Sequence, residues 1–296
     1  MKIEANGISI EVEDSGDKNA PAVLLIMGLG MQLTSWPPAL VDTLLKAGYR
    51  VIRFDNRDIG LSSHLDTLGR PKIVWSVVKH RLRLPIKPPY SLADMAKDAL
   101  GVLDALNVAR AHVVGVSMGG MIAQRVALTY PSRVLSLTSI MSSSGAKSLP
   151  GPRAEISRAM ISRPKTKDKQ TLINHSVKIF QMIGSPDHAD QEHVLRERIG
   201  RNLDRAYNPV GILRQMVAIV SDTDRSKQLG DISAPTLVIH GMDDPLVPFA
   251  CGLDTAKRIP GAKLLGIPGM GHDLPVSLVP TFCTALIQHF QAAVVP

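Results

Sequence analysis

The sequence predicts an α/β protein that has a mostly parallel sheet with helices on both of its faces. Short apolar segments alternate with longer amphipathic segments along most of the chain, which is the pattern of repeated β-α units. The 296 residues are 45% hydrophobic and 20% charged, as in folded globular proteins. This length is sufficient for one large core or for two domains.

The N-terminal third supplies the first predicted strands. Residues 2–14 are expected to form a β-hairpin, because Asn6-Gly7 provides the positive φ angles that a tight turn requires. Apolar runs then predict buried strands at 22–27 and 49–55. A helix is predicted between them, at 32–47, from the spacing of its apolar residues.

Two further β-α units follow. Residues 91–106 are predicted to be helical, because Ser91 can cap the N-terminus and the apolar residues fall on one face. Residues 111–116 are typical of a buried strand, 118–129 of a helix, and 134–141 of the next strand.

The alternation stops between residues 142 and 233. This stretch is polar, and its apolar residues recur at helical spacing, for example over 170–183 and 191–205. We interpret it as a helical cap inserted into a core domain. The core domain then comprises residues 1–141 and 234–296.

The sheet is predicted to resume after the insertion. Apolar runs predict strands at 235–240 and 262–267, and a last helix is expected at 275–291. In an open parallel sheet, ligands bind beyond the carboxyl ends of the strands. The segments that follow these ends are therefore where a functional site is expected.

The most informative motif is Gly115-Val116-Ser117-Met118-Gly119, where an apolar strand runs into a helix. Gly-x-Ser-x-Gly in this context places a serine hydroxyl on a sharp turn, close to backbone N–H groups. An alcohol is a weak nucleophile, so it needs a base that a third group orients. His272 follows the last predicted strand, and Asp243 and Asp244 follow the preceding one.

Together these segments resemble the α/β-hydrolase fold superfamily, and within it the bacterial esterase branch that includes aclacinomycin methylesterase. The order serine, acid, histidine is that of this fold. Many relatives have His-Gly where this chain has Met27-Gly28, a pair that the methylesterase-like branch shares. The resemblance implies an eight-stranded sheet and serine esterase activity. It is carried by residues 25–30 with Trp36, 54–62, 115–119, 240–244 and 268–272.

The resemblance assigns a role to each residue of the triad. Ser117 is expected to be the nucleophile and His272 the base that takes its proton. Asp244 is expected to orient the histidine, because the family places the acid four positions before Pro248. Asp243 is then a solvated neighbour. The other known position for the acid, just after strand 134–141, offers only serines.

The oxyanion of an acyl-transfer intermediate needs two backbone N–H donors. Met118, at the start of the helix after Ser117, is expected to supply one. The resemblance gives Leu29 as the other, in a loop where Gly28 and Gly30 allow close approach.

Other polar residues near the motifs are expected to be structural. His240 ends a strand, and the resemblance implies that Asp55, Arg57 and Asp58 shape a loop through ion pairs. No group of His, Cys or acidic residues has metal-ligand spacing and no phosphate loop is present, so neither a metal nor a cofactor is expected.

The expected partner is a small-molecule ester with an apolar acyl or alcohol part. Four methionines near the predicted centre indicate an adaptable apolar site. They are Met27, Met118, Met121 and Met270.

The formal net charge of +8 is concentrated in the insertion and in Lys72–Lys87, which includes Lys79, Arg81 and Arg83. We favour a lid segment whose charges stay in water. The alternative is a basic amphipathic helix at 73–84 that rests on an anionic membrane. Nucleic-acid binding is not expected, because only 4% of the residues are aromatic and no binding module is recognised.

A cytoplasmic location is expected. Only Cys251 and Cys283 are present, too few for a disulfide framework, and both are expected to pack as small apolar groups. The N-terminus lacks the apolar centre of a signal peptide, and no run of 18 apolar residues exists.

Several activities remain open within this fold. Thioesterase, lipase-like, amidase, perhydrolase and carbon–carbon hydrolase reactions use the same triad. Haloalkane dehalogenases and epoxide hydrolases have an aspartate where this chain has Ser117. A non-catalytic ligand-binding receptor is the alternative of a different class.

Overall fold

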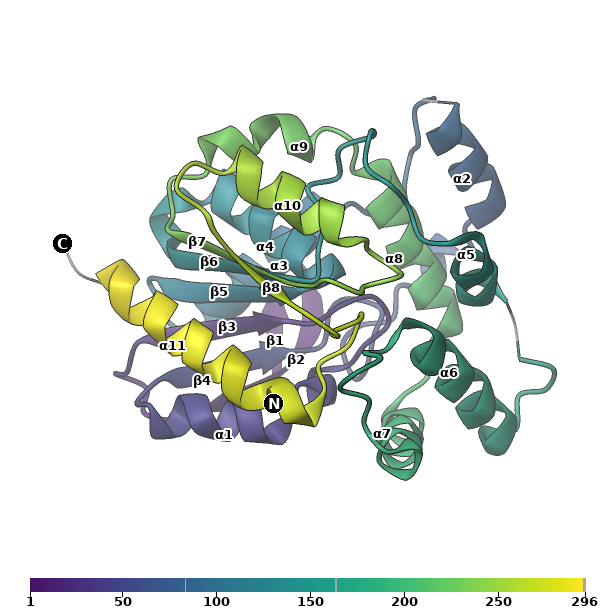
Figure 1. Cartoon of the computed structure of the whole chain (residues 1–296), viewed down its shortest axis with the longest axis horizontal. Helices are drawn as coiled ribbons and strands as arrows, with labels where there is room; N and C mark the ends of the chain where they lie inside the picture. Colours follow the sequence, from purple (N-terminus) through teal and green to yellow (C-terminus); the bar gives the residue numbers. More distant parts are fainter. Residues whose placement is uncertain (83, 163, 295–296) are drawn as a thin grey trace.

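The computed structural model describes residues 1–82, 84–162 and 164–294 (Figure 1). Arg83 of the basic segment and the last two residues of the predicted core domain lie outside the described residues. The chain forms an eight-stranded sheet in the order β1-β2-β4-β3-β5-β6-β7-β8. The strands are β1 (Lys2–Ala5), β2 (Ile8–Ser15), β3 (Ala22–Ile26), β4 (Arg50–Phe54), β5 (Ala111–Val116), β6 (Val134–Ile140), β7 (Thr236–Gly241) and β8 (Lys263–Ile267).

The predicted mostly parallel sheet of eight strands is confirmed. From β4 to β8 all neighbouring strands are parallel. Only β1 and β2 run antiparallel to their neighbours. They form the predicted hairpin, and Asn6 and Gly7 have φ angles of 50° and 76° in its turn.

Helices cover both faces of the sheet, as predicted. In Figure 1, α3, α4 and α10 lie above the sheet, and α1 and α11 lie below it. One hydrophobic core lies between the sheet and α3 and α4, and another lies between the sheet and α1 and α11. Alternate residues of β3 enter the two cores: Leu24 packs in the first and Val23 in the second. These helices are α1 (Pro38–Lys46), α3 (Leu92–Ala105), α4 (Met118–Thr129), α10 (Phe249–Arg258) and α11 (Val279–Val294).

Helix α3 has the predicted N-terminal cap. The Ser91 hydroxyl accepts a hydrogen bond from the Asp94 amide, and the Asp94 carboxylate accepts one from the Ser91 amide. This reciprocal pair satisfies two amides that would otherwise lack partners.

The prediction of one helix over residues 32–47 is wrong. The structure has a short 3-10 turn at Leu33–Ser35, and α1 begins only at Pro38. A residue before proline is disfavoured in the α conformation, and Trp36 and Pro37 are accordingly extended, with ψ near 130°. The remaining 3-10 turns are Asp66–Leu68, Pro131–Arg133, Leu229–Asp231 and Val276–Leu278.

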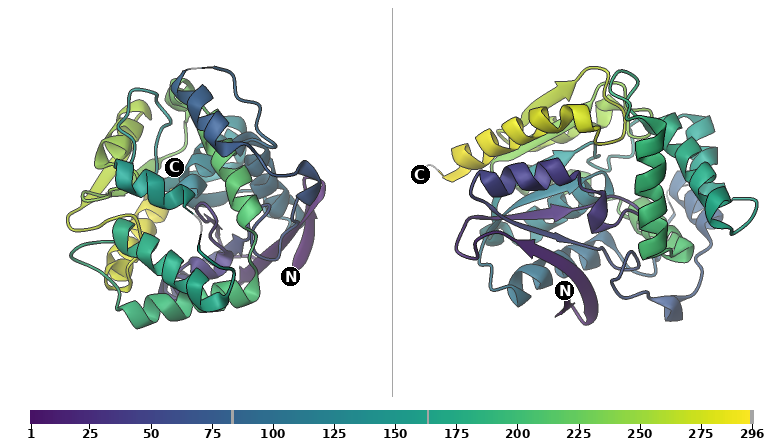
Figure 2. Two further views of the ribbon diagram at one scale, coloured as in Figure 1. Left: turned by 90° about the vertical axis from the view of Figure 1, so that its right-hand side faces the viewer. Right: turned by 90° about the horizontal axis from the view of Figure 1, so that it is seen from below.

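Between β6 and β7 all regular elements of the described residues are helices. Helices α6 and α7 share a small core of their own, which contains Ile173, Val177, Leu195 and Ile199. Figure 2 shows α5, α6, α7 and α8, together with α2, grouped at one end of the sheet, whereas α9 lies above the sheet near α10 in Figure 1. The helices between β6 and β7 are α5 (Ala154–Ile161), α6 (Lys169–Ile183), α7 (Glu192–Arg205), α8 (Pro209–Ser221) and α9 (Arg225–Gln228), and α2 is Ile73–Arg81.

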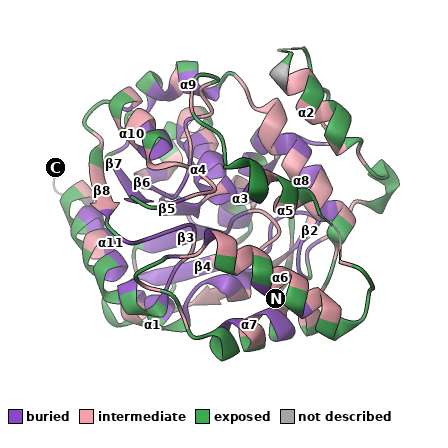
Figure 3. Cartoon of the chain, turned by 45° about the vertical axis from the view of Figure 1, so that its right-hand side comes forward, coloured by how far each residue is buried: buried purple, intermediate pink, exposed green. Residues whose placement is uncertain are grey.

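Figure 3 shows that the strands are buried and that the outward faces of α2, α5, α6 and α7 are exposed. None of the helices in the described part of the chain has both the length and the apolar character that crossing a bilayer requires.

Candidate active site

Ser117 lies at the junction of β5, which is buried throughout, and α4. Its backbone has φ 55° and ψ −118°, a conformation that is strained for any residue other than glycine. Two hydrogen bonds hold the turn against the end of β6. The Ser117 amide donates to the Ile140 carbonyl at 2.9 Å, and the Ser142 hydroxyl donates to the Ser117 carbonyl at 2.7 Å.

The glycines that flank Ser117 allow the backbone to pack closely. A Cβ atom on Gly115 would lie 2.0 Å from the Gly119 carbonyl oxygen. A Cβ atom on Gly119 would lie 2.1 Å from the carbonyl oxygen of Ile26, in β3. The motif therefore lets the start of α4 contact two strands at the point where Ser117 emerges.

Ser117, His272 and Asp244 form a continuous hydrogen-bonded chain. His272 Nε2 lies 2.9 Å from Ser117 Oγ, and His272 Nδ1 lies 2.6 Å from Asp244 Oδ2. With Nδ1–H donating to the carboxylate, Nε2 is free to accept the serine proton. Ser117 is half-buried, whereas His272 and Asp244 are 8% and 5% exposed. The Ser117 hydroxyl is thus the accessible end of this hydrogen-bonded series of three side chains.

Asp244 is fixed on both of its oxygens. Oδ1 accepts hydrogen bonds from the amides of Leu246 at 2.9 Å and Val247 at 2.8 Å, while Oδ2 faces His272. Asp243 is exposed, as expected, but its carboxylate also accepts a hydrogen bond from the Gly269 amide at 2.8 Å. Asp243 therefore stabilises the loop that precedes His272, and it makes no hydrogen bond to the imidazole.

His240 is fully buried beside the same loop. Its Nε2 lies 2.8 Å from the Val247 carbonyl oxygen and 3.6 Å from Asp244 Oδ2. Burial lowers the pKa of His240, so the ring is neutral and Nε2–H donates to Val247. These contacts are those of a residue that supports the Asp244 loop.

The loop of Gly28, Leu29 and Gly30 follows β3 and lies against the serine. A Cβ atom on Gly28 would lie 3.2 Å from Ser117 Cβ. Within the described residues the Leu29 amide has no hydrogen-bond acceptor. Met118 is the first residue of α4, so its amide has no acceptor within the helix. Neither amide therefore donates a backbone hydrogen bond within the described residues.

Gln215, on α8, holds this loop from the other side and was not anticipated from the sequence. Its side chain is fully buried. Oε1 accepts a hydrogen bond from the Gly30 amide at 2.9 Å, and Nε2 donates to the Arg57 carbonyl at 3.0 Å. The signal that could have revealed it is the polar pair Arg214-Gln215 within an otherwise apolar helix.

The charged loop after β4 forms ion pairs, and the partners come from three separate helices. Arg214 is fully buried and contacts the Asp58 carboxylate at 2.7 and 2.8 Å. Burial by itself would raise the pKa of Asp58, but the hydrogen bonds from Arg214 and the Leu65 amide hold it below its usual value. The pairs are Arg57 with Asp98 of α3, Asp58 with Arg214 of α8, and Asp55 with Arg205 of α7.

The loop that carries His272 is held by the end of α6. The His272 amide donates to the Ile183 carbonyl at 2.7 Å, and the Gly271 amide donates to the Ser185 hydroxyl at 2.9 Å. The Ser185 hydroxyl in turn donates to Asp273. Residues between β6 and β7 thus position the imidazole, which sequence spacing did not indicate.

The remaining predicted residues pack in the interior. Met27 and Met270 belong to one hydrophobic core, and Met118 and Met121 belong to the other. Cys251 and Cys283 are both buried free thiols. No group of three potential metal ligands comes together in the part of the chain that the structure describes.

The alpha/beta hydrolase fold family matches residues 21–276. The rhodomycin D methylesterase DnrP of Streptomyces peucetius is 31% identical over 97% of this chain and 97% of its own length. The putative carbamate hydrolase RutD of Variovorax paradoxus is 29% identical over 94% of each chain.

A comparison of structures gives the same fold. The enol-lactonase from Burkholderia xenovorans superimposes with a TM-score of 0.76 at 23% identity, over 98% of this chain and 100% of the lactonase. At this identity the likeness concerns the arrangement of helices and strands.

Proposed function

The chain belongs to the α/β-hydrolase fold family, and on this basis we propose that it is a serine esterase that cleaves carboxylic esters through an acyl-enzyme. The hydrogen-bonded chain from Ser117 through His272 to Asp244 is the observation that carries this proposal. A half-buried alcohol, a base with a free nitrogen and a fixed carboxylate are the groups that nucleophilic acyl transfer needs.

In the first half-reaction, Ser117 Oγ attacks the ester carbonyl while its proton passes to His272 Nε2. Asp244 stabilises the imidazolium and remains ionised. The tetrahedral intermediate then collapses. Its carbon–oxygen bond to the alcohol breaks, and His272 returns the proton to the leaving oxygen. Water repeats the sequence on the acyl-enzyme, releasing the acid and restoring the Ser117 hydroxyl.

The amides of Leu29 and Met118 are the proposed donors to the oxyanion. Both lie next to Ser117, and the positive end of the α4 dipole points at the same place. Such donors lower the barrier because negative charge develops on the carbonyl oxygen only as the reaction proceeds.

We place the cap at residues 142–233, above a core of residues 1–141 and 234–296. The contacts of Gln215 with the oxyanion loop and of Ile183 with His272 support a cap that adjoins the reaction centre. The methylesterase relative suggests methyl esters as the first substrates to test.

The proposal is tested by replacing the nucleophile. Ser117→Ala should lower kcat/KM for p-nitrophenyl esters by about 10⁴-fold or more, because only binding and oxyanion stabilisation remain. A fluorophosphonate probe should label Ser117 alone. Ser132→Ala, at an exposed serine in the 3-10 turn that follows the C-terminal end of α4, is the control and should retain full turnover and labelling. Labelling at another residue would contradict the assignment.

The carbamate hydrolase relative makes carbon–nitrogen cleavage a second candidate. A methyl ester and a thioester of one acyl group, compared with a methyl carbamate that shares only the alcohol part of the ester, distinguish the two, since kcat/KM should be highest for the ester. If ligands raise the unfolding temperature without any turnover of the whole panel, the chain is a binding protein and not an enzyme.

A further inference from the structure

Helix α2 carries apolar side chains on its outward face as well as toward the protein. Val74, Val78 and Leu82 are spaced four residues apart, and Trp75 lies beside them. These side chains are 68%, 36%, 62% and 55% exposed, respectively. On the opposite side, His80 Nδ1 donates to the Val220 carbonyl oxygen of α8 at 2.8 Å. A helix that is apolar on both sides is normally covered on both.

The outward face, which we call the α2 stripe (Val74, Trp75, Val78 and Leu82), projects from the molecule. In Figures 1 and 2, α2 lies at the outer edge of the group of helices beyond the sheet. Continuous exposed apolar surface of this kind marks a site of interaction with another surface.

The charges in the chain segment that carries the stripe are of one sign. Between Asp66 and Asp94 the sequence contains no carboxylate and six cationic residues, against a net charge of +8 for the whole chain. A surface that covers the stripe must therefore be negatively charged as well as apolar. The six are Arg70, Lys72, Lys79, Arg81, Arg83 and Lys87.

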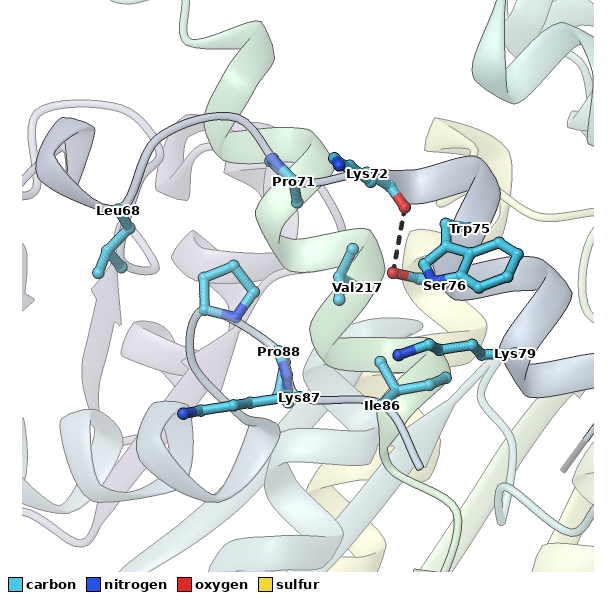
Figure 4. A pocket seen from close by; sticks show the side chains of 11 residues that line it. Leu68, Pro71, Lys72, Trp75, Ser76, Lys79, Ile86, Lys87, Pro88 and Val217 are labelled. Atoms are coloured by element: carbon cyan, nitrogen blue, oxygen red, sulfur yellow. Dashed lines mark hydrogen bonds between the residues drawn. The ribbon is translucent and has the colours of Figure 1, made fainter. Parts of the chain in front are cut away.

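A pocket of about 430 Å³ opens beside the stripe, between α2 and α8. Lys72, Lys79 and Lys87 line it together with Trp75 and Val217, and the lining contains no acidic residue. Figure 4 shows the Lys79 side chain extending across the pocket toward Ile86. The Lys79 ammonium lies 6.0 Å from the centre of the Trp75 ring. The pocket suits an anionic head group with apolar carbon next to it.

We propose that the α2 stripe docks on an anionic lipid bilayer. The valines, Leu82 and Trp75 would enter the boundary between head groups and acyl chains, where tryptophan is favoured. The lysines can lay their methylene stems along this apolar surface while their ammonium groups reach lipid phosphates. This docking does not depend on the proposed chemistry. If both the docking and the proposed esterase activity are correct, the docking brings the enzyme to the bilayer, where apolar esters accumulate.

Sedimentation with lipid vesicles tests the docking. The unmodified protein should bind vesicles of phosphatidylcholine containing one part in three of phosphatidylglycerol, and should not bind vesicles of phosphatidylcholine alone. Binding should weaken as salt is added, because salt screens the attraction between exposed charges. The chain has two tryptophans, and Trp36 is fully buried, so a blue shift of fluorescence on binding reports on Trp75.

Paired variants separate the two components of the binding. Lys79→Gln with Lys87→Gln should weaken binding about 30-fold, since each lysine near an anionic surface contributes about fivefold. Trp75→Ser with Leu82→Ser should weaken vesicle binding to a similar degree. It should also abolish the blue shift, because the reporting tryptophan is then absent. The matched controls are Lys46→Gln with Lys257→Gln for the lysine pair, and Val194→Ser for the apolar pair. They alter exposed residues of α1, α10 and α7 and should bind vesicles as the unmodified protein does.

Three results would overturn the proposal. The first is no binding of the unmodified protein to the anionic vesicles. The second is equal weakening by the control variants, which would mean that only net charge matters. The third is a dimer that Trp75→Ser dissociates, which would mean that a second copy covers the stripe. Unchanged unfolding temperature and p-nitrophenyl ester turnover in each variant establish that the fold is intact.

Discussion

Asp243 and Asp244 are neighbours in the chain, yet their carboxylates contact different partners. Asp244 faces the imidazole at 2.6 Å, and two amides fix its other oxygen. Asp243 reaches the Gly269 amide instead. The difference arises because consecutive side chains leave the backbone in different directions, and only one of the two carboxylates can face His272.

This geometry predicts unequal effects of two otherwise identical substitutions. Asp244→Asn should lower kcat by about 10⁴-fold, because the amide favours the wrong imidazole tautomer. Asp243→Asn should reduce it by less than about tenfold, because the asparagine oxygen can still accept the Gly269 amide. Esterase kinetics of the two variants measure the difference. A larger loss in Asp243→Asn would exchange the two assignments.

At the scale of elements, α8 connects the insertion to the reaction centre. Gln215 bridges the Gly30 amide and the Arg57 carbonyl, and Arg214 on the same helix pairs with Asp58. The loop whose amide is proposed to bind the oxyanion is therefore set by a helix far away in the sequence. Gln215 is a positioning residue, because its side-chain hydrogen bonds go to Gly30 and Arg57 and not to Ser117.

Gln215→Leu should leave two buried backbone groups without partners and let the oxyanion loop shift. We expect kcat to fall by about 10- to 100-fold with a smaller change in KM, since displacements near 1 Å reduce catalysis to this extent. Gln215→Glu keeps the acceptor for the Gly30 amide and should retain more activity than the leucine variant. Equal kcat in the wild type and Gln215→Leu would mean that the loop holds its position without the glutamine.

At the scale of the whole molecule, several histidines lie in the interior in the neutral form. His112 stacks on Phe290 with 4.4 Å between ring centres, and its Nδ1 lies 2.8 Å from Ser136 Oγ. Burial, with smaller effects of His289 and Arg110, lowers the pKa of His112 to about 4. Burial also lowers the pKa of His240 and His289.

The protein should therefore lose stability as the pH falls from about 6.5 to about 4. In this range the unfolded chain takes up a proton at His112 and the folded chain does not. This difference lowers the free energy of unfolding by about 3 kcal/mol at the lower end of the range. Urea unfolding at several pH values measures it. His112→Asn should reduce the slope of unfolding free energy against pH, and the exposed control His193→Asn should leave it unchanged. An unaltered slope in His112→Asn would assign the acid sensitivity to other groups.

Much of the fold could be predicted because alternating apolar and amphipathic runs are local signals. The strand that precedes Ser117 was predicted over 111–116, as the structure has it, and the insertion helix predicted at 191–205 differs by one residue. The break at Pro37-Pro38 was missed, although proline restrictions are also local. The contacts of α6 and α8 with the candidate active site could not be predicted from the sequence, because hydrogen bonds such as Gly30 to Gln215 join residues 185 positions apart.

The sequence by itself determined the family, the order of the strands along the chain, and the serine and histidine proposed for the triad. Motifs and periodicity depend only on neighbouring residues, so they can be read directly. The tertiary structure decided which of two adjacent carboxylates meets the imidazole and which helix holds the oxyanion loop. It also decided which face of α2 is left uncovered. These depend on side-chain direction and on packing between distant segments, which no local pattern encodes.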